Sequence, residues 1–276
     1  MIIAKLQGGL GNQMFQYAVG RSLAEKHEDK LYLETSSLLR PWATPREYGL
    51  DIFNIRAELT NADEIIRASD VLFRICQIKR GFHKGILECP RYGNIVLEGY
   101  WQNELYFKEI ENIIREELTF KSLDYKTTDL RLREQISSTA AVCVHVRRGD
   151  YLLPEGSNFV NVGIDYYKKA IELIAAAVRN PHFYVFSDDI NWCVENLSLD
   201  YPHTFVSRDQ PAAKYTAQDL RLMTICRHFI MANSSFSWWA AWIGSNDDNI
   251  VIAPMNWFRD DHVASENITP SRWIRL

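Results

Sequence analysis

The sequence predicts an α/β protein built on parallel sheets and organised in two parts. From residue 140 onward, short apolar strands alternate regularly with helical segments, which is typical of a parallel sheet with helices on both faces. The chain also begins with a strand, a glycine-rich turn and a helix. A polar stretch, residues 121–138, lies between these regions and is typical of a passage between domains. A chain of 276 residues is long enough for one large domain or two modest ones.

The first strand is expected over Ile2–Gln7, followed by the turn Gly8–Asn12 and a helix. This order is that of a dinucleotide-binding unit, but Met14 stands where the third glycine would be, so the fingerprint fails. The glycines still bring the backbone and the side chains of Asn12 and Gln13 close to whatever lies above the end of the strand. A tight strand-to-helix turn without a ligand is the alternative interpretation.

The next stretch is less regular. Strands are expected over Leu31–Glu34 and Ile95–Tyr100, with loops over 36–57 and helical pieces within 58–94. A helix is expected over about Glu104–Leu118.

Trp101 and Gln102 come directly after the second of these strands. An aromatic ring for stacking and an amide for hydrogen bonding are what a sugar site needs. This pair is therefore a candidate for binding an acceptor.

The second half of the chain repeats one pattern. Strands are expected near 141–146, 182–187, 203–207, 228–232 and 249–253. Helices are expected between them, near 165–178, 189–197, 215–226 and 235–243.

The strand over Ala141–Val146 is dominated by β-branched residues and ends in a group of charged side chains. His145, Arg147, Arg148 and Asp150 follow one another within six residues. Open α/β sheets bind ligands at the carboxyl ends of their strands. Two adjacent arginines can hold a diphosphate through planar, bidentate hydrogen bonds that lysine cannot reproduce. A surface cluster of ion pairs is the alternative.

A second group of polar residues stands between a strand and a helix. Asn233, Ser234, Ser235 and Phe236 open the helix that Gly244 ends. Free N–H groups and the positive end of the helix dipole at this place suit phosphate oxygens. The alternative is a capped helix whose tryptophans face the core.

Carboxylates accompany these groups. Asp188 and Asp189 end another strand on the same side of the predicted sheet, and Asp219 lies one helix before Ser235. Asp219 could accept a hydrogen bond from a base or a ribose, or it could be an ordinary carboxylate in the first turn of a helix. The sequence lacks the Asp-x-Asp spacing that holds a divalent ion against a nucleotide-sugar diphosphate, so we expect arginines and a helix end, not a metal, to neutralise phosphate. Asp188 or Asp189 would then orient an arginine.

The composition narrows the class of protein. The net charge of −4 and the isoelectric point near 6.0 argue against a general nucleic-acid binder. Five cysteines, none in a Cys-x-x-Cys spacing, favour neither a zinc site nor a disulfide framework. With no apolar run long enough for a membrane helix and no secretory signal, we expect a soluble, cytoplasmic protein with no cofactor.

Several of these segments together resemble the bacterial α-1,2-fucosyltransferases of glycosyltransferase family 11. The resemblance covers nearly the whole chain, and its segments are Gly8–Ala18, Leu97–Gln102, His145–Tyr151, Phe186–Asp189, Asn233–Trp242, Ile252–Pro254 and Trp257–Phe258. It implies a GT-B architecture of two Rossmann-like domains. Residues 1–130 would serve the acceptor and residues 131–276 would bind GDP-β-L-fucose. The implied reaction is metal-independent, inverting transfer to O2 of a terminal galactose.

The resemblance also implies roles for single residues. Arg147 inherits contact with the β-phosphate of the donor, and His145 lies by the nucleotide. Asp219, sixteen residues before Ser235, inherits the role of binding the nucleoside. The turn near Asn12 is similar to one that faces the reacting centre in protein O-fucosyltransferases.

The proton acceptor of the reaction is expected among the carboxylates after Arg148. Asp150 is the first candidate and Glu155 the second; Glu155 matches the base of certain α-1,6 enzymes but stands in a Pro-Glu-Gly-Ser loop. Where some related enzymes carry a lysine after the motif's aspartate, this chain has Tyr151. Two alternatives stay open, a relative with another donor or linkage and a non-catalytic protein that binds a GDP-sugar.

Overall fold

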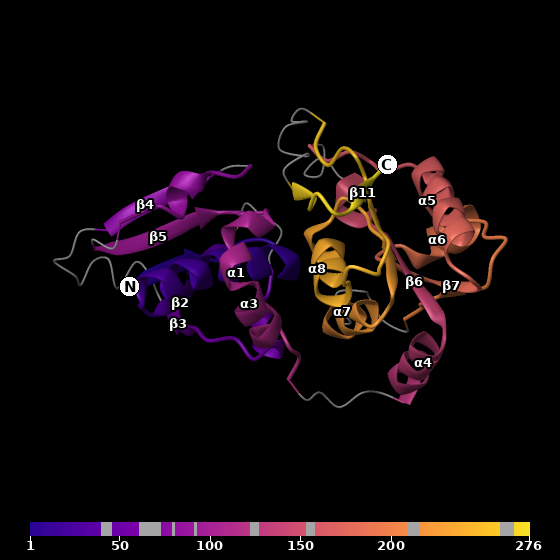
Figure 1. The fold of residues 1–276 in the computed structure, drawn as a ribbon, viewed down its shortest axis with the longest axis horizontal. Coiled ribbons are helices and arrows are strands. Elements are labelled where there is room, and N and C mark those ends of the chain that lie inside the picture. The colour runs from indigo at the N-terminus through magenta and orange to yellow at the C-terminus, as the bar shows by residue number, and fades with distance from the viewer. Residues whose placement is uncertain are drawn as a thin grey trace. The chain divides into compact units, whose positions relative to one another are not determined.

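The computed structural model describes residues 1–39, 46–60, 73–78, 81–90, 93–121, 127–152, 158–208, 216–259 and 268–276. The chain divides into two units, Met1–Ser122 and Leu123–Leu276 (Figure 1). The division precedes helix α4, Thr127–Ser138. The predicted boundary between residues 130 and 131 therefore falls inside this helix, within the polar stretch that was predicted to pass between two domains.

The first unit is organised around a five-stranded parallel sheet in the order β3-β2-β1-β5-β4. Its strands are β1 Ile2–Lys5, β2 Leu31–Glu34, β3 Glu58–Thr60, β4 Phe73–Ile78 and β5 Asn94–Gly99. The strands β1, β2 and β5 were predicted. The edge strands β3 and β4 lie where only helical pieces had been expected, so that part of the prediction is wrong.

Helix α1, Leu10–His27, connects β1 to β2 and is buried along almost its whole length. Its last turn ends at Glu28, whose left-handed backbone (φ 52°) lets its N–H bond the carbonyls of Ala24 and Glu25. A helix buried on every side must satisfy its polar residues internally, and α1 carries Gln13, Gln16 and Arg21. These three side chains consequently have defined hydrogen-bond partners, described below.

The helix predicted over Glu104–Leu118 is broken into three pieces. Two short 3-10 turns, Glu104–Tyr106 and Lys108–Ile110, precede helix α3, Glu111–Glu117. The side chain of Asn103 caps the first turn, and this turn ends at Phe107, whose backbone (φ −133°, ψ 15°) lies outside the α-helical region.

The second unit contains a six-stranded parallel sheet in the order β11-β10-β9-β6-β7-β8. Its strands are β6 Ala140–Val146, β7 Pro181–Ser187, β8 His203–Phe205, β9 His228–Ile230, β10 Val251–Ala253 and β11 Ile274–Arg275. The helices after α4 are α5 Ile164–Ala177, α6 Ile190–Asn196, α7 Thr216–Thr224 and α8 Ser235–Gly244. Apart from the short edge strand β11, this succession of strands and helices along the chain was predicted; their spatial order in the sheet was not.

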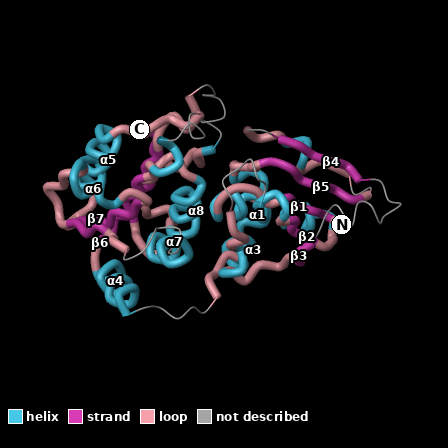
Figure 2. Tube along the Cα trace, turned by 180° about the vertical axis from the view of Figure 1, so that it is seen from behind, coloured by secondary structure: helices cyan, strands magenta, loops and turns pink. Residues whose placement is uncertain are grey.

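Helices cover both faces of this sheet. On one face, Val142, Val144 and Val146 of β6 pack in a core cluster with α5 and α6. Helices α7 and α8 lie together, apart from α5 and α6 (Figures 1 and 2). Because strand side chains alternate between faces, Cys143 and His145 point to the side opposite the three valines. The ring contact of His145 with Phe236 places α8 on that side.

Among the described helices, none is both long and apolar enough to cross a membrane.

Candidate active site

Three neighbouring strands of the second unit end at the same edge of their sheet. Strand β6 lies between β7 and β9 and is parallel to both. The chain passes from β6 to β7 and β8 on one side and then returns to β9 on the other, so the strand order reverses between β6 and β9. In open α/β sheets such a reversal leaves a crevice beyond the carboxyl ends, where ligands bind. The predicted residues from 145 to 150 and from 233 to 236 lie at this edge, at or after the ends of β6 and β9.

Arg147, directly after β6, is held by a carboxylate that follows β7. Its Nη1 lies 2.9 Å from Oδ2 of Asp188, and its guanidinium carbon lies 5.7 Å from the ring centre of Tyr151. The side chain remains 26% exposed. Arg147 is thus oriented by neighbours and still partly open to an anion.

Arg148 is more strongly engaged in the protein itself. Its Nε donates to Oδ2 of Asp189 at 3.3 Å, its guanidinium stacks 3.7 Å from the ring centre of Trp192, and its backbone N–H donates to Oδ1 of Asp188 at 2.9 Å. These contacts tie the end of β6 to the end of β7. Asp188 or Asp189 was predicted to orient an arginine. In the structure, Asp188 pairs with Arg147 and Asp189 pairs with Arg148.

Gly149 allows this close approach. A Cβ atom at this position would lie 2.6 Å from Oδ2 of Asp188, the oxygen that pairs with Arg147. Any larger residue would push against the carboxylate that orients the arginine.

His145 is a neutral imidazole within the site. It is 5% exposed, its ring lies 5.7 Å from that of Phe236, and within the described part of the chain its Nδ1 has no hydrogen-bond partner. Burial, and then the nearby charge of Arg147, lower the pKa of His145 to about 3. A buried, unpartnered ring nitrogen can hydrogen-bond an uncharged part of a ligand.

The start of α8 supplies backbone N–H groups at the same edge. Ser234 caps the helix by accepting the N–H of Phe236 at 3.3 Å, and Ser235 is half-buried in the first turn. Asn233 donates its amide to the carbonyls of Val160 (2.8 Å) and Trp257 (3.1 Å), so this side chain supports the loop and does not offer its N–H groups to a ligand. The tryptophans of α8 are buried in the core, as the alternative interpretation held.

Tyr151 also supports the loop at Asn233, a role that the sequence did not reveal. Its hydroxyl donates to the carbonyl of Asn233 at 2.9 Å, and its ring stacks on Phe159 with ring centres 4.4 Å apart. A lone tyrosine after the arginine motif carries no signal in one sequence that would have identified this role.

Asp219, in the first turn of α7, is bound by Arg208. Burial raises the pKa of Asp219 to about 6, although Arg208 opposes the shift. Asp150 lies in a 3-10 turn, Gly149–Leu152, and its side chain is outside the described residues, as is Glu155.

The glycine turn of the first unit places Asn12 beside Gln102. The amide of Gln102 donates to Oδ1 of Asn12 at 2.8 Å, and both side chains are half-buried. Gly8 has a φ of +77°, and a Cβ atom there would lie 2.5 Å from the amide nitrogen of Asn12. Only glycine fits this position without displacing Asn12.

Gln13 and Trp101, predicted to contact the acceptor, are buried instead. Gln13 donates to the carbonyls of Gly8 (3.1 Å) and Glu47 (2.9 Å) and accepts the N–H of Gly49 (3.0 Å). Trp101 is 2% exposed and packs edge-on against Tyr106. Both residues therefore support the turn from within and leave Asn12 and Gln102 as its partly accessible side chains.

Gln16 has a comparable supporting role that the sequence analysis missed. It accepts the N–H of Gln7 at 3.0 Å and donates to the carbonyls of Gln7 (3.2 Å) and Gly99 (2.9 Å). These bonds join the ends of β1 and β5 just before the turns that carry Asn12 and Gln102.

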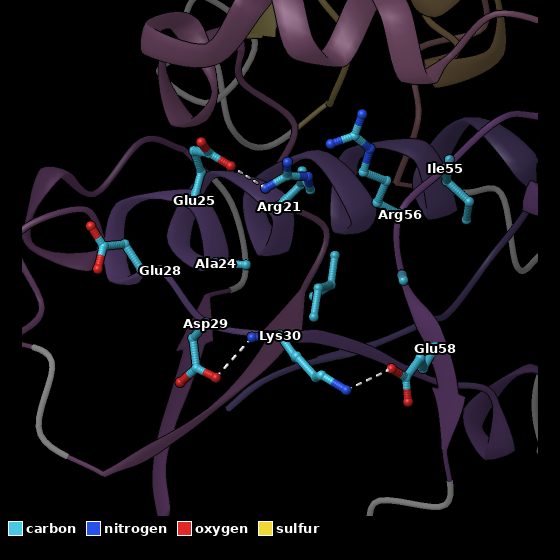
Figure 3. Close-up of a pocket in the computed structure, with 11 residues that line it drawn as sticks. Arg21, Ala24, Glu25, Glu28, Asp29, Lys30, Ile55, Arg56 and Glu58 are labelled. Atoms are coloured by element: carbon cyan, nitrogen blue, oxygen red, sulfur yellow. Dashed lines mark hydrogen bonds and ion pairs between the residues drawn. The ribbon is translucent and has the colours of Figure 1, made fainter.

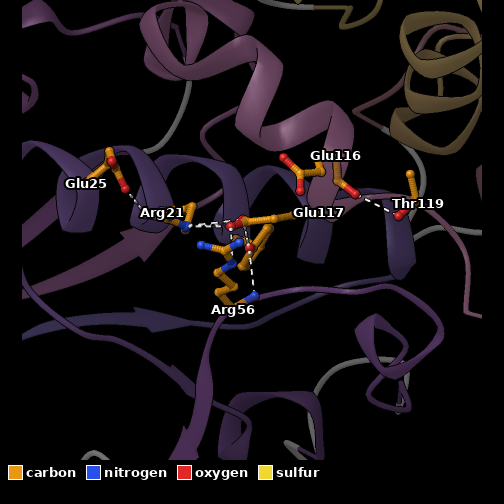
Figure 4. A network of polar contacts seen from close by, with 7 residues as sticks. Arg21, Glu25, Arg56, Glu116, Glu117 and Thr119 are labelled. Carbon is orange, nitrogen blue, oxygen red and sulfur yellow. Dashed lines mark hydrogen bonds and ion pairs between the residues drawn. The ribbon is translucent and has the colours of Figure 1, made fainter.

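Another polar cluster surrounds the later turns of α1. Glu117 of α3 receives Nε of Arg21 at 3.1 Å and Nε of Arg56 at 3.5 Å, and it also accepts the hydroxyl of Tyr17 (Figure 4). A pocket of about 650 Å³ lies beside it, and charges on its wall pair with one another, as Lys30 does with Glu58 (Figure 3). Residues of α1 from Arg21 onward line this pocket, whereas Asn12 is in the first turn of the helix. The cluster is separate from the glycine turn.

Within the described ranges, no three histidine, cysteine, aspartate or glutamate side chains gather as they would around a metal ion.

Comparison with known proteins agrees with this architecture. The chain matches the model "Glycosyl transferase family 11" over residues 1–276. It is 30% identical to the α-1,2-colitosyltransferase of Escherichia coli, covering 100% of this chain and 99% of that protein. It is 31% identical to the O-antigen biosynthesis glycosyltransferase WbnK of the same organism, covering 98% of this chain and 99% of that protein.

More distant relatives extend the comparison. Galactoside α-(1,2)-fucosyltransferase 1 of Mus musculus is 27% identical, over 87% of this chain and 62% of that protein. The solved structure of the α-1,6-fucosyltransferase NodZ soaked with GDP-fucose aligns with a TM-score of 0.51 and 14% identity, over 88% of this chain and 91% of that chain. This likeness shows the fold, which is GT-B with two parallel sheets, as predicted. The family match spans every residue from 1 to 276, and the chain belongs to glycosyl transferase family 11.

Proposed function

We propose that this glycosyltransferase moves L-fucose from GDP-β-L-fucose to O2 of a terminal β-galactoside, with inversion and without a metal ion. The observation that carries the proposal is the pairing of Arg147 with Asp188 at the edge where α8 begins. This arrangement offers a partly exposed guanidinium and the backbone N–H groups at the start of α8 to one anion. The galactoside α-(1,2)-fucosyltransferase of Mus musculus supports both the sugar and the linkage, and the α-1,2-colitosyltransferase supports the linkage.

The chemistry is a single in-line displacement. The acceptor O2 attacks C1 of fucose as the bond from C1 to the phosphate oxygen breaks, and GDP leaves with the electron pair. Negative charge therefore grows on the diphosphate in the transition state. Arg147 and the N–H groups near Ser234 and Ser235 would bind this charge more strongly than the intact donor, which lowers the barrier.

The neighbouring residues would keep Arg147 in place. Asp188 pairs with its guanidinium, while Arg148 and Asp189 join the ends of β6 and β7. Because these contacts hold Arg147 in one conformation before the donor binds, less conformational entropy is lost when the transition state forms.

The nucleoside would lie on the side of β6 that carries His145. There the neutral imidazole and the ring of Phe236 offer a hydrogen bond and apolar contact, and Asp219 offers a carboxylate. Asn233 would act through the loop that it supports.

The acceptor would be bound by the first unit. Asn12 and Gln102 are its proposed contacts, with Gln13 and Trp101 as their support. Asp150 remains the first candidate for removing the acceptor proton, and Glu155 the second. The carboxamide variants Asp150→Asn and Glu155→Gln should each bind GDP, and the one that loses turnover by about 10²-fold or more identifies the base.

A colitosyl donor is the second candidate, because a full-length relative is an α-1,2-colitosyltransferase. Colitose lacks the 3-hydroxyl of fucose. A site that hydrogen-bonds this hydroxyl rejects the deoxy sugar strongly, whereas an apolar site discriminates weakly between the two. The ratio of kcat/KM for GDP-fucose and GDP-colitose therefore decides between them.

The decisive assay is incubation with GDP-fucose and lactose, with detection of free GDP and of a fucosylated trisaccharide. Formation of both supports transfer, and NMR of the product reports the linkage and the anomeric configuration. Binding of GDP without any turnover would instead support a non-catalytic sugar-nucleotide binder. Activity should survive excess EDTA; a loss restored by Mn²⁺ or Mg²⁺ would contradict neutralisation by arginine.

A further inference from the structure

Three charged residues from different elements of the second unit form a chain of contacts. Arg208, which follows β8, donates Nε to Oδ1 of Asp219 at 3.0 Å, and its Nη2 contacts the same oxygen. Its Nη1 pairs with Oδ1 of Asp129 in α4. The side chains are 1% exposed at Asp129, 11% at Arg208 and 15% at Asp219. Asp129 is therefore the deepest member and Asp219 the one nearest to solvent.

The contacts leave one oxygen of Asp219 unused. Both bonds from Arg208 reach Oδ1, and within the described ranges no hydrogen bond reaches Oδ2. Two donors fix the position of Oδ1, and the other oxygen keeps its capacity to accept. The planar guanidinium thus anchors Asp219 through Nε and Nη2, while Asp129 binds its Nη1.

The cluster lies along the face of β6 that carries His145. Asp219 interacts electrostatically with Cys143, and strand side chains two positions apart share a face. His145 is the next side chain on that face and contacts Phe236 at the start of α8. Asp219 and the proposed nucleoside site are therefore on the same side of the sheet.

We propose that Asp129 and Arg208 are positioning residues that aim the carboxylate of Asp219 at the nucleobase of the donor. This inference rests on the proposed function, because it takes a guanosine nucleotide as the ligand. Guanine presents N–H donors at N1 and at its 2-amino group, which an acceptor-only carboxylate can bind. Adenine presents an acceptor at N1, so an oriented carboxylate selects against it.

The charges of the two positioning residues act on Asp219 in opposite directions. Arg208 lowers its pKa and Asp129 raises it, while burial raises the pKa to about 6. The thiol of Cys143 on β6 also faces the carboxylate, and burial raises the pKa of that thiol, which keeps it neutral near pH 7. Ionised Asp219 is the form that accepts N–H groups, so GDP binding should weaken as the pH falls through about 6.

The test compares GDP binding by calorimetry between pH 5 and 8 in the full-length chain. The acid limb of the binding profile is the pH range over which GDP affinity falls as the pH is lowered. In Arg208→Gln, loss of the positive charge should move this limb to higher pH and weaken binding near pH 7 by about tenfold or more. In Asp129→Asn, loss of the negative charge should move the limb to lower pH. Glu134→Gln, an exposed carboxylate on the same helix α4, is the matched control and should leave the profile unchanged.

Two further measurements complete the design. ADP should bind more weakly than GDP to the wild-type chain, and the preference for GDP should shrink in Arg208→Gln. Thermal unfolding of each variant shows whether it folds. Two opposite shifts of the acid limb cannot come from destabilisation alone, because destabilisation weakens binding in both variants. Arg208→Lys keeps the charge but loses the planar fork. Its acid limb should therefore lie close to that of the wild type, while its affinity for GDP stays below the wild-type value.

The outcomes separate this inference from the proposed function. If the wild-type chain binds GDP but the limb shifts in the same direction in both variants, or in neither, the positioning pair is overturned and the proposed function stands. If the wild-type chain binds no GDP, the proposed function falls and this inference falls with it.

Discussion

Arg147 and Arg148 are adjacent in the sequence, yet the structure gives their guanidinium groups different surroundings. Arg147 pairs with Asp188 and remains partly exposed, whereas Arg148 pairs with Asp189 and stacks on Trp192. The sequence motif alone shows two equal arginines. Asp188 and Asp189, which follow β7, and Trp192 of α6 produce the difference in their surroundings.

Replacing each arginine by lysine should therefore have different effects. Arg147→Lys keeps the charge but loses the bidentate fork, so kcat/KM should fall roughly 10²-fold or more with little change in Tm. Arg148→Lys should mainly lower the free energy of unfolding, by about 1–2 kcal/mol, since it loses the stacking on Trp192 and the bond to Asp189. Steady-state kinetics and thermal unfolding of both variants test this. Wild-type kinetics in Arg147→Lys would refute its assignment.

His145 should make stability depend on pH. Its folded-state pKa of about 3 is below the ordinary value of 6.5, so the unfolded chain binds a proton that the folded chain does not. This contribution to stability is therefore lost as the pH falls from about 6.5 toward 3. In His145→Phe, the slope of the unfolding free energy between pH 4 and 6 should be smaller by up to about 1.4 kcal/mol per pH unit. Denaturant unfolding measured at several pH values tests this, and identical slopes would contradict it.

At the scale of elements, the ends of β6 and β7 are joined so closely that a single methyl group should disturb them. In Gly149→Ala, the new Cβ would lie 2.6 Å from Oδ2 of Asp188. The carboxylate must move, Arg147 loses its orientation, and kcat/KM should fall by about tenfold or more. The matched control is Gly163→Ala before α5, where a Cβ atom meets nothing within 4 Å. Equal activity of the two variants would show that the Arg147–Asp188 pair does not need this contact.

Elements with a strong local pattern were the ones predicted correctly. The run of buried residues in β6 and the alternation after it gave nearly every strand and helix of the second unit. The strand β3 was missed because its three residues, Glu58–Thr60, are partly exposed at a sheet edge and lack an apolar alternation. Pairing with β2, which sequence periodicity does not encode, makes it a strand.

The site was predictable where a chemical group is exposed at a strand end and unpredictable where a polar residue is buried. Gln13 looked like a ligand contact because it follows the glycine turn, but its amide completes hydrogen bonds within the fold. Asp129 stood in a polar stretch that suggested a linker, yet it is almost fully buried against Arg208. To distinguish a buried polar residue from a ligand contact, one must know which backbone groups or charges of the fold lie within hydrogen-bond distance of its side chain.

At the scale of the whole molecule, each unit has a complete parallel sheet, and the proposed donor residues all belong to one of them. His145, Arg147 and Ser234 lie in the unit Leu123–Leu276, around its six-stranded sheet and its core cluster. Asn12 and Gln102 belong to the other unit. The division of the chain therefore coincides with the proposed division of labour between donor and acceptor.

The fragment 123–276 should accordingly fold alone and bind GDP with an affinity similar to that of the full chain, while catalysing no transfer to lactose. Among the described residues, its six strands pair only with one another, so separating the fragment from residues 1–122 breaks no described sheet. Circular dichroism and a cooperative unfolding transition test folding, and calorimetry tests binding. Arg147→Ala within the fragment is the control and should abolish GDP binding. A folded fragment that binds no GDP, beside a full chain that does, would place part of the donor site in residues 1–122.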